Sequence, residues 1–263
     1  MCIAYIAFSP KGEWPLFIAA NRDEVHQRPT AAARPWTHNT DIIAGLDLES
    51  RGTWLGITRH GRVALITNYR DPHHSVPHAR SRGLLTREFL EGTLDPPAYM
   101  ELVARTGNHY NGFNLIVSDL KDTCYYSNRK PQGIGPEPLA QGRYVLSNHF
   151  LDTPWPKAQR LRTALDSLQP GQAVLRPDLV FDILRDTTQA PDHELPATGL
   201  TRERERLLSS PFIISDTYGT RCSTVIAVRR DGTMLLSEQS YGPDARVTGR
   251  HDWRWTLDSP ITH

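Results

Sequence analysis

Met1-Cys2-Ile3-Ala4-Tyr5-Ile6-Ala7-Phe8 opens the chain, and Leu16-Phe17-Ile18-Ala19-Ala20-Asn21-Arg22-Asp23-Glu24 follows a turn at Ser9-Pro10-Lys11-Gly12. Two apolar runs joined by residues of this kind are typical of a β-hairpin. In a hairpin the end of the second strand returns to the start of the first, so the polar residues 21–24 come to lie beside Cys2. A strand directly after Cys2 also holds this residue at a sheet edge, whereas a free terminus would fray.

Cys2 can combine a nucleophile and its base on one residue. Its side chain is small, so an aminopeptidase can remove Met1 and leave the α-amino group of Cys2 free. The thiol then attacks, and the amine, with a reference pKa of about 7.7–8.0, accepts the proton near neutral pH. The alternative is a small buried apolar residue that happens to follow the initiator. We expect Met1 to be absent from the mature protein.

Cys2 together with the segment Ala19-Ala20-Asn21-Arg22-Asp23-Glu24 resembles the NRDE family, also called the transport and Golgi organisation 2 family. The resemblance runs from Cys2 to the region of Tyr241. That family resembles the N-terminal-nucleophile (Ntn) hydrolases, most closely the branch of conjugated bile acid hydrolase and penicillin V acylase. The four-residue motif alone is weakly specific, whereas its combination with a cysteine at position 2 is strongly specific.

The composition fits a soluble globular protein. Of the 263 residues, 38% are hydrophobic and 22% are charged, which allows a sizeable core in one large domain or two small ones. No clear linker or internal repeat divides the chain, so we predict a single domain over residues 1–263. The net charge of +1 favours neither nucleic acid nor an anionic membrane as a partner.

Cysteine use and hydropathy indicate the compartment. The three cysteines, Cys2, Cys124 and Cys222, are too few for a disulfide framework, and the last two lie in strand-like contexts typical of core residues. No apolar run approaches the roughly 20 residues of a membrane span. The first run lacks a basic region before it and stops at Phe8, so it is a poor secretory signal. We expect a cytoplasmic protein in a reducing environment.

Strand patterns flank a helical middle section. After the first hairpin, strands are expected at residues 54–57, 62–67, 113–118, 123–127, 143–147, 212–215, 224–228 and 234–238. Helices are expected at residues 84–90, 95–107, at residues 179–184 after Pro177-Asp178, and in the segment from Thr153-Pro154 to Pro170-Gly171. Irregular segments are expected at residues 25–36, 132–142 and 189–206, and in a polar tail from Pro243 anchored by Trp253 and Trp255. This order predicts an α+β protein with helices outside two stacked antiparallel sheets. The family resemblance implies the four-layer αββα sandwich of the Ntn hydrolases.

Four polar residues stand where apolar runs end: Asp23, Asn68, Asn148 and Arg221. Singly, each is the kind of residue that turns and strand edges favour. The resemblance implies more, because the bile acid hydrolase branch has an Asp after its second strand that contacts the nucleophile, and Asp23 matches it. Asn68 resembles the Asn that helps to form the oxyanion hole, Asn148 resembles the Asn after the middle strand, and Arg221 corresponds to a late Arg. With Cys2 they form the predicted catalytic set, which provides a nucleophile, a group that orients its base and oxyanion donors.

One position departs from the bile acid hydrolase pattern. That pattern has Arg three residues before the Asp, where this chain has Ala20. Arg22 adjoins Asp23 instead, and neighbouring residues of a strand point to opposite faces. Asn21 and Arg22 of the motif are predicted to bind the substrate, and either Arg22 or Arg221 could favour the thiolate of Cys2 by its charge.

The segment after Asn68 is basic. Arg70, His73, His74, His78, Arg80 and Arg82 fall within thirteen residues. The histidine spacing matches no strong zinc signature and no cysteine lies nearby, so we predict no metal site and no cofactor. A solvated loop is one interpretation. The other is a cavity mouth in which Arg70 and Arg82 receive a carboxylate or phosphate.

Two functions remain open. The first is a cytoplasmic Ntn-type hydrolase that cleaves an amide or a thioester through an acyl-Cys2 intermediate. The second is a non-catalytic protein on the same fold that binds or carries an anionic small molecule, since the resemblance implies links to haem handling and to lipid or acyl-coenzyme A metabolism. The fold does not decide between them, because function depends on the site.

Overall fold

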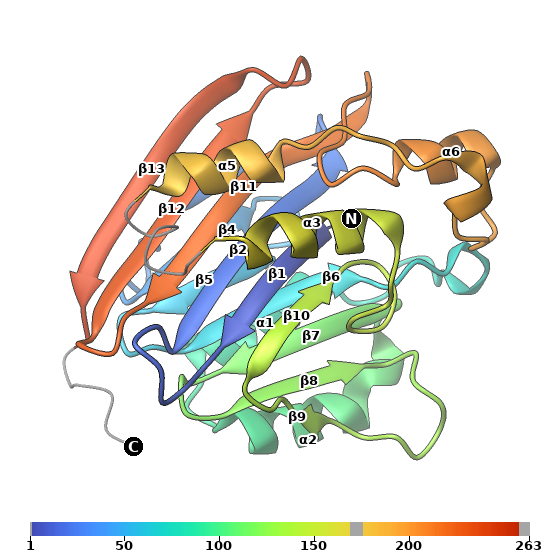
Figure 1. The fold of residues 1–263 in the computed structure, drawn as a ribbon. Coiled ribbons are helices and arrows are strands. Elements are labelled where there is room, and N and C mark those ends of the chain that lie inside the picture. Colours follow the sequence, from blue (N-terminus) through green and yellow to red (C-terminus); the bar gives the residue numbers. More distant parts are fainter. Residues whose placement is uncertain (1, 169–175, 258–263) are drawn as a thin grey trace.

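A computed structural model describes residues 2–168 and 176–257, whose strands form two stacked antiparallel sheets (Figure 1). The strand order of the first sheet is β10 (Gly142–Leu146), β1 (Cys2–Phe8), β2 (Leu16–Val25), β11 (Tyr218–Val228), β12 (Thr233–Tyr241) and β13 (Val247–Thr256). The order of the second sheet is β3 (Thr30–Pro35), β4 (Ile42–Asp47), β5 (Leu55–Thr58), β6 (Val63–Asn68), β7 (Phe113–Ser118), β8 (Thr123–Ser127) and β9 (Glu137–Pro138).

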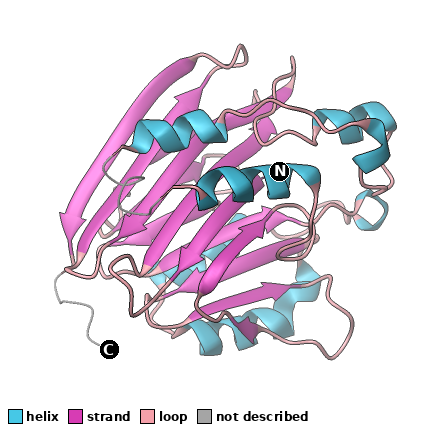
Figure 2. Ribbon diagram, viewed as in Figure 1, coloured by secondary structure: helices cyan, strands magenta, loops and turns pink. Residues whose placement is uncertain are grey.

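Helices cover the outer faces of both sheets, as Figure 2 shows. The helices are α1 (Gly83–Glu91), α2 (Pro96–Thr106), α3 (Pro156–Asp166), α5 (Pro177–Leu184) and α6 (Arg202–Leu207), with 3-10 turns at Pro72–His74, Gly107–His109 and Asp192–Glu194. The apolar sides of α3 and α5 pack on the first sheet, and those of α1 and α2 pack on the second. A third apolar cluster fills the space between the sheets. The predicted α+β class and αββα sandwich are confirmed.

The predicted N-terminal hairpin forms the centre of the first sheet. β1 and β2 pair from Cys2 opposite Arg22 to Phe8 opposite Leu16. Successive side chains of β1 point to opposite faces of the sheet. Ala4 and Ile6 therefore face the space between the sheets, and Ile3 faces the helices. Because β10 and β11 flank the hairpin, Cys2 lies in the middle of the sheet, at the end of its strand.

Five predicted segments differ from the structure. Residues 132–142, predicted to be irregular, contain β9 and the first residue of β10. Residues 25–36 contain β3, and the polar tail contains β13, with Trp253 and Trp255 packed against the inner core as expected. Residues 212–215 are apolar and buried up to Ile213 but form no strand, because their hydrogen bonds go to loop and side-chain groups instead of a ladder.

Residues 189–206, predicted to be irregular throughout, include α6. The helix begins where the Thr201 hydroxyl accepts a hydrogen bond from the Arg204 backbone N–H at 3.3 Å. It is anchored because Glu205, on its inner side, is buried against Arg70.

Two predictions fall outside the described residues, namely the helix end at Pro170-Gly171 and the removal of Met1. Within residues 2–168 and 176–257, no helix has the length and apolar character needed to cross a membrane.

Candidate active site

Cys2 lies at the start of β1 with Arg22 directly opposite on β2, so both side chains face the space between the sheets. Burial raises the pKa of the Cys2 thiol. The charge of Arg22 and a hydrogen bond from the Asp23 backbone N–H act in the opposite direction, and the charge of Asp23 adds to the increase. Cys2 is half-buried, and its desolvated thiol needs a proton acceptor before the sulfur can act as a nucleophile.

Arg22 is held rigidly beside Cys2. Its guanidinium lies 4.2 Å from the ring centroid of Trp54, donates to the Thr30 hydroxyl at 3.3 Å and approaches the Glu24 carboxylate at 3.9 Å. Arg22 is only 5% exposed, which makes these contacts stronger than at a solvated surface. Ala20 stands where the bile acid hydrolase pattern has an arginine. Ala20 and Arg22 both face the space between the sheets, so this chain has its arginine two residues later on the same face.

Asp23 points to the other side of β2, where it is buried. Its Oδ1 accepts a hydrogen bond from the Thr220 hydroxyl at 2.7 Å. Burial raises the pKa of the Asp23 carboxyl, and the positive charges of Lys157 and Arg22 oppose this shift. Asp23 also contributes to the wall of the cavity that Cys2 lines.

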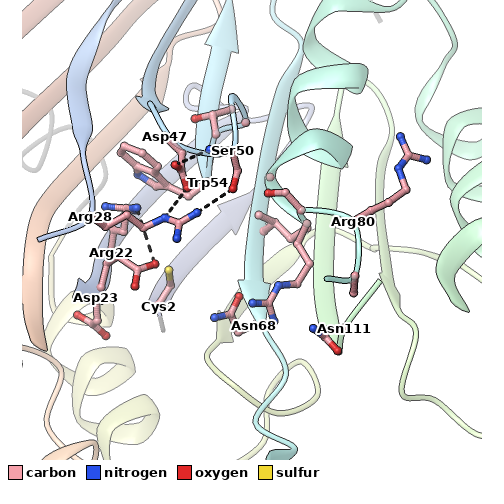
Figure 3. Close-up of a pocket in the computed structure, with 18 residues that line it drawn as sticks. Cys2, Arg22, Asp23, Arg28, Asp47, Ser50, Trp54, Asn68, Arg80 and Asn111 are labelled. Atoms are coloured by element: carbon pink, nitrogen blue, oxygen red, sulfur yellow. Dashed lines mark hydrogen bonds and ion pairs between the residues drawn. The ribbon is translucent and has the colours of Figure 1, made fainter. Parts of the chain in front are cut away.

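Asn68 and Asn148 join the two sheets next to Cys2. Asn68 ends β6 and lines the cavity that contains Cys2 (Figure 3). The Asn148 side chain is fully buried and donates from Nδ2 to the Asn68 carbonyl oxygen at 3.1 Å. The neighbouring Ser147 hydroxyl lies 3.2 Å from the Cys2 carbonyl oxygen and 3.2 Å from Asn148 Oδ1, both of which it can donate to. Asn148 therefore contacts the Asn68 backbone without lining the cavity, whereas Asn68 faces the cavity.

Besides Asn148, three further predicted residues do not line this cavity. Asn21 points to the helix layer, where it donates to the carbonyl oxygens of Leu184 and Pro211 at 2.8 and 2.9 Å. Arg221 lies at a bulge in β11, and its guanidinium donates to the main-chain carbonyl oxygens of residues 25 and 28.

The third residue, Arg70, forms a buried ion pair. Its Nη1 lies 2.5 Å from Glu205 Oε2, and its guanidinium stacks on Trp155 at 4.6 Å. Arg70 lines a neighbouring cavity of about 260 Å³, which shares Asn68 and Arg82 with the first.

The cavity at Cys2 has a volume of about 410 Å³ and a strongly charged wall. Its charged residues are Arg22, Arg28, Arg80, Arg82, Asp23, Glu24 and Asp47. In Figure 3, Cys2, Arg22 and Arg28 lie on one side of this space, and Asn68 and Asn111 lie on the other. Arg28 is neutralised by Asp47 at 2.8 Å. No such partner is found for Arg82 in the part of the chain that the structure describes, where it donates to the carbonyl oxygen of residue 112 at 3.0 Å.

The basic segment after Asn68 offers no metal site within the described residues, where no cluster of three His, Cys, Asp or Glu side chains could hold an ion. His74 instead forms an exposed hydrogen bond with Asp71 at 2.8 Å. The cavity wall takes only Arg80 and Arg82 of the predicted basic group.

Sequence reasoning missed Lys157 and Trp54. Lys157 is 1% exposed and donates to Asn148 Oδ1 at 3.2 Å. The sequence contains a signal for it, because Lys157 lies four and eight residues before Leu161 and Leu165, on the apolar stripe of α3. A lysine on such a stripe is rarely fully buried unless it has partners. No sequence pattern singles out Trp54, because its contact with Arg22 joins residues of two different sheets.

Comparisons with known proteins agree with this architecture. The family model described as Transport and Golgi organisation 2 matches residues 1–243. A Transport and Golgi organization protein 2 homolog of Bos taurus is 38% identical over 278 residues, covering 97% of this chain and 99% of the relative. Two solved structures share the fold at low identity, a penicillin V acylase from Agrobacterium tumefaciens and an N-acylethanolamine-hydrolyzing acid amidase ortholog from Caenorhabditis elegans.

The penicillin V acylase is 14% identical with a TM-score of 0.53, over 97% of this chain and 86% of that one. The amidase ortholog is 12% identical with a TM-score of 0.51, over 86% and 92%. At these identities the likeness concerns the fold alone, which is that of the Ntn hydrolases.

Proposed function

This chain belongs to the Transport and Golgi organisation 2 family, and we propose that it is an Ntn-type cysteine hydrolase that cleaves an amide or a thioester through Cys2 after removal of Met1. The observation that carries the proposal is the position of Cys2, at the first residue of a central strand and in the wall of a charged cavity that Asn68 also lines. Two proteins of similar fold whose names denote an acylase and an amidase support this reaction class.

The proposed reaction needs no group beyond this chain and water. The Cys2 sulfur attacks the carbonyl carbon of the substrate, and the thiol proton passes to the α-amine of Cys2. The tetrahedral intermediate then breaks its C–N or C–S bond, and the protonated amine returns the proton to the leaving atom. A water molecule, deprotonated by the same amine, attacks the acyl-Cys2 thioester, releases the carboxylic acid and restores the thiol.

The surrounding residues take supporting roles in this proposal. The Asn68 side chain donates to the oxyanion from the wall formed by the second sheet. Asp23, buried behind β2, orients the α-amine, and Asn148 holds the Asn68 backbone in place through its bond to the Asn68 carbonyl oxygen.

We propose an anionic small-molecule substrate. Arg22 faces the cavity beside Cys2, and Arg82 faces it with no carboxylate in ion-pair contact among the described residues. Burial lowers the pKa of Arg82, as expected where a guanidinium is desolvated without full compensation. A carboxylate or phosphate of the substrate would supply that compensation. The three free thiols support a reducing location such as the cytoplasm.

Intact-mass analysis of the full chain, before and after incubation with N-acyl amino acids and acyl thioesters, tests the proposal. We expect a protein without Met1 and a transient acyl adduct that maps to Cys2. Cys2→Ala should form no adduct, while Cys124→Ala, which changes a cysteine in the outer core of the second sheet, should form it as the parent does. Retention of Met1, or the absence of any adduct across the panel, would reject the hydrolase.

The second candidate is a non-catalytic protein that binds or carries an anionic ligand such as haem or an acyl-coenzyme A. Burial of the Cys2 thiol, which raises its pKa and disfavours the reactive thiolate, is the observation in its favour. In that case Cys2→Ala would bind the same ligand with unchanged affinity, as measured by calorimetry.

A further inference from the structure

The proposed reaction takes place in one cavity, and a second cavity of about 260 Å³ adjoins it. The two cavities share three lining residues, Asn68, Arg82 and Asn111. In Figure 3, Asn68 and Asn111 lie across the first cavity from Cys2. Pockets for small molecules typically measure about 300–1,000 Å³, so the second cavity fits a part of a ligand. A molecule whose carbonyl group lies at Cys2 can therefore extend past Asn68 into the second cavity.

Arg82, in the shared wall, differs from the other arginines of the first cavity. Arg22, Arg28 and Arg80 each have a carboxylate oxygen nearby, at 3.9, 2.8 and 3.2 Å. Among the described residues, Arg82 has no carboxylate in ion-pair contact, and its Nη1 donates to the Gly112 carbonyl oxygen at 3.0 Å. A guanidinium offers five N–H donors in a planar fork. Arg82 thus keeps both its charge and further donors for a ligand.

The second cavity has an excess of positive charge. Arg204 of α6 also lines it, and no carboxylate in the described part of the chain forms an ion pair with this arginine. The Arg204 guanidinium lies 5.4 Å from the ring centroid of Tyr218, a contact that limits its movement. The one carboxylate among the described lining residues, Asp71, is neutralised by Arg129 at 3.1 Å. The charges of Arg82 and Arg204 therefore remain for an anion from outside the chain.

We propose that the second cavity is the subsite for an anionic group of the substrate, a carboxylate or a phosphate, which Arg82 and Arg204 bind while the scissile carbonyl lies at Cys2. The substrate class is then an acyl compound whose anionic group stands several bonds away from the amide or thioester. This inference rests on the proposed function for the position of the scissile bond. Guanidinium groups suit the role, because they bind carboxylate and phosphate through two parallel hydrogen bonds. Leu200 and Leu208 in the same wall offer apolar contact to the rest of the ligand.

Affinity labels that react with Cys2 test this subsite without the need for turnover. N-alkyl iodoacetamides alkylate the thiol, with loss of iodide, and their tails of graded length end in a carboxylate, a phosphonate or a neutral hydroxyl. Peptide mapping of the full chain gives the labelling rate of Cys2 for each reagent. We expect the best anionic tail to label the parent about tenfold faster than the hydroxyl tail of equal length, the effect of one charge-assisted hydrogen bond. The carboxylate and phosphonate series show which of the two anions the subsite prefers.

Three variants locate the anion. Arg82→Gln should reduce the preference to less than about twofold, and Arg204→Gln, which changes an exposed side chain, should reduce it to about threefold. Arg202→Gln removes an exposed arginine of the same helix that lines neither cavity, so the tenfold preference should remain. Because the preference is a ratio of two reagents within one variant, any change in the reactivity of Cys2 itself cancels.

Equal rates for anionic and neutral tails in the parent would overturn the proposal, as would a preference that both Arg82→Gln and Arg204→Gln retain. Arg204 lies at the surface, so its variant keeps the test decisive if Arg82→Gln fails to fold. A parent that forms acyl-Cys2 but shows no preference would reject this inference alone. A parent that shows the preference but forms no acyl-Cys2 would keep the anion subsite and reject the hydrolase.

Discussion

The two faces of the β1–β2 hairpin near Cys2 use polar side chains in different ways. On the inner face, Cys2 and Arg22 line a cavity of about 410 Å³. On the helix face, Asn21 and Asp23 are 1% exposed and hydrogen-bonded to main-chain carbonyl and hydroxyl groups. Strand alternation thus places Arg22 of the Asn-Arg-Asp-Glu motif in the cavity wall, and Asn21 and Asp23 among buried protein partners. Neighbours in the motif do not share a role.

This division predicts two kinds of response to mutation. Polar groups on the helix face are buried with protein partners, so their loss should change folding stability and its pH dependence. Groups on the inner face meet solvent or ligand in the cavity, so their loss should change the reactivity of Cys2 more than stability.

The largest expected effect is the pH dependence of stability due to Lys157. Its pKa is lowered from 10.5 to about 7 on folding, so between these values the unfolded chain binds more protons and the free energy of unfolding rises with pH. Lys157→Met removes this term. The difference between the two proteins should grow by about 1.4 kcal/mol per pH unit as the pH falls from 10.5 to 7, to about 5 kcal/mol, and then level off.

Urea unfolding of both proteins between pH 6 and 9 measures this difference, because other titrating groups cancel in it. Lys121→Met, which changes an exposed lysine in a turn, should run parallel to the parent. Curves for Lys157→Met that also run parallel would mean that Lys157 keeps an ordinary pKa and that the helix face is less dry than its burial indicates.

Asn21 should have the next largest effect. Asn21→Leu removes the hydrogen bonds that Asn21 donates to the carbonyl oxygens of Leu184 and Pro211 and the one it accepts from the Ser223 hydroxyl, and leaves these groups buried. We expect the free energy of unfolding to fall by about 3 kcal/mol in urea titrations. The matched change at the exposed Asn108 should cost less than about 0.5 kcal/mol. A stable Asn21→Leu protein with altered substrate preference would instead return Asn21 to the binding site, as the motif predicts.

The sequence predicts the fold better than it predicts the site. Alternating apolar residues and turn signals locate the first hairpin, and the resemblance supplies the αββα layers. Cys2, Asp23 and Asn68 stand at strand ends, where polar residues tend to gather at one edge, and the resemblance implies their roles. Cys2 and Asn68 line the cavity, and Asp23, whose carboxyl is bonded on the helix face, also contributes to its wall. Asn148 was predicted for the same reason and supports Asn68 from behind.

The remaining residues depend on contacts between segments far apart in the chain. The sequence predicts that Arg70 binds an anionic ligand, but in the structure it forms an ion pair with Glu205, which lies 135 positions later. In the sequence, Arg22 is displaced by two residues from the arginine of the bile acid hydrolase pattern. Its position beside Cys2 becomes evident only from the strand register and from its contact with Trp54. Such pairings are set by tertiary packing, which local pattern does not encode.

Arg22 should have a smaller effect, and on the other face. Arg22→Met removes a charge that lowers the pKa of Cys2, so alkylation of Cys2 near pH 7 should slow about fivefold. Loss of the Trp54 and Thr30 contacts should cost only about 1 kcal/mol of stability. Peptide-mapped labelling with iodoacetamide, alongside urea unfolding, gives both values. If Arg22→Met lost much stability while Cys2 was labelled at the parent rate, the inner face would respond to mutation as the helix face does, and the distinction between the two faces would be wrong.

Arg221 should show the smallest effect, although the family resemblance implies a catalytic role for it. Its guanidinium donates to the carbonyl oxygens of Val25 and Arg28 at 2.9 and 3.3 Å and does not line the cavity. Arg221→Met should therefore leave Cys2 labelling within about twofold of the parent and lower the free energy of unfolding by about 1 kcal/mol, the net value of a few partly exposed hydrogen bonds. The same labelling and urea experiments as for Arg22→Met provide the measurement, with that variant as the matched arginine. A fivefold slowing in Arg221→Met would show that its charge reaches Cys2 through the sheet, and the predicted catalytic set would then include it.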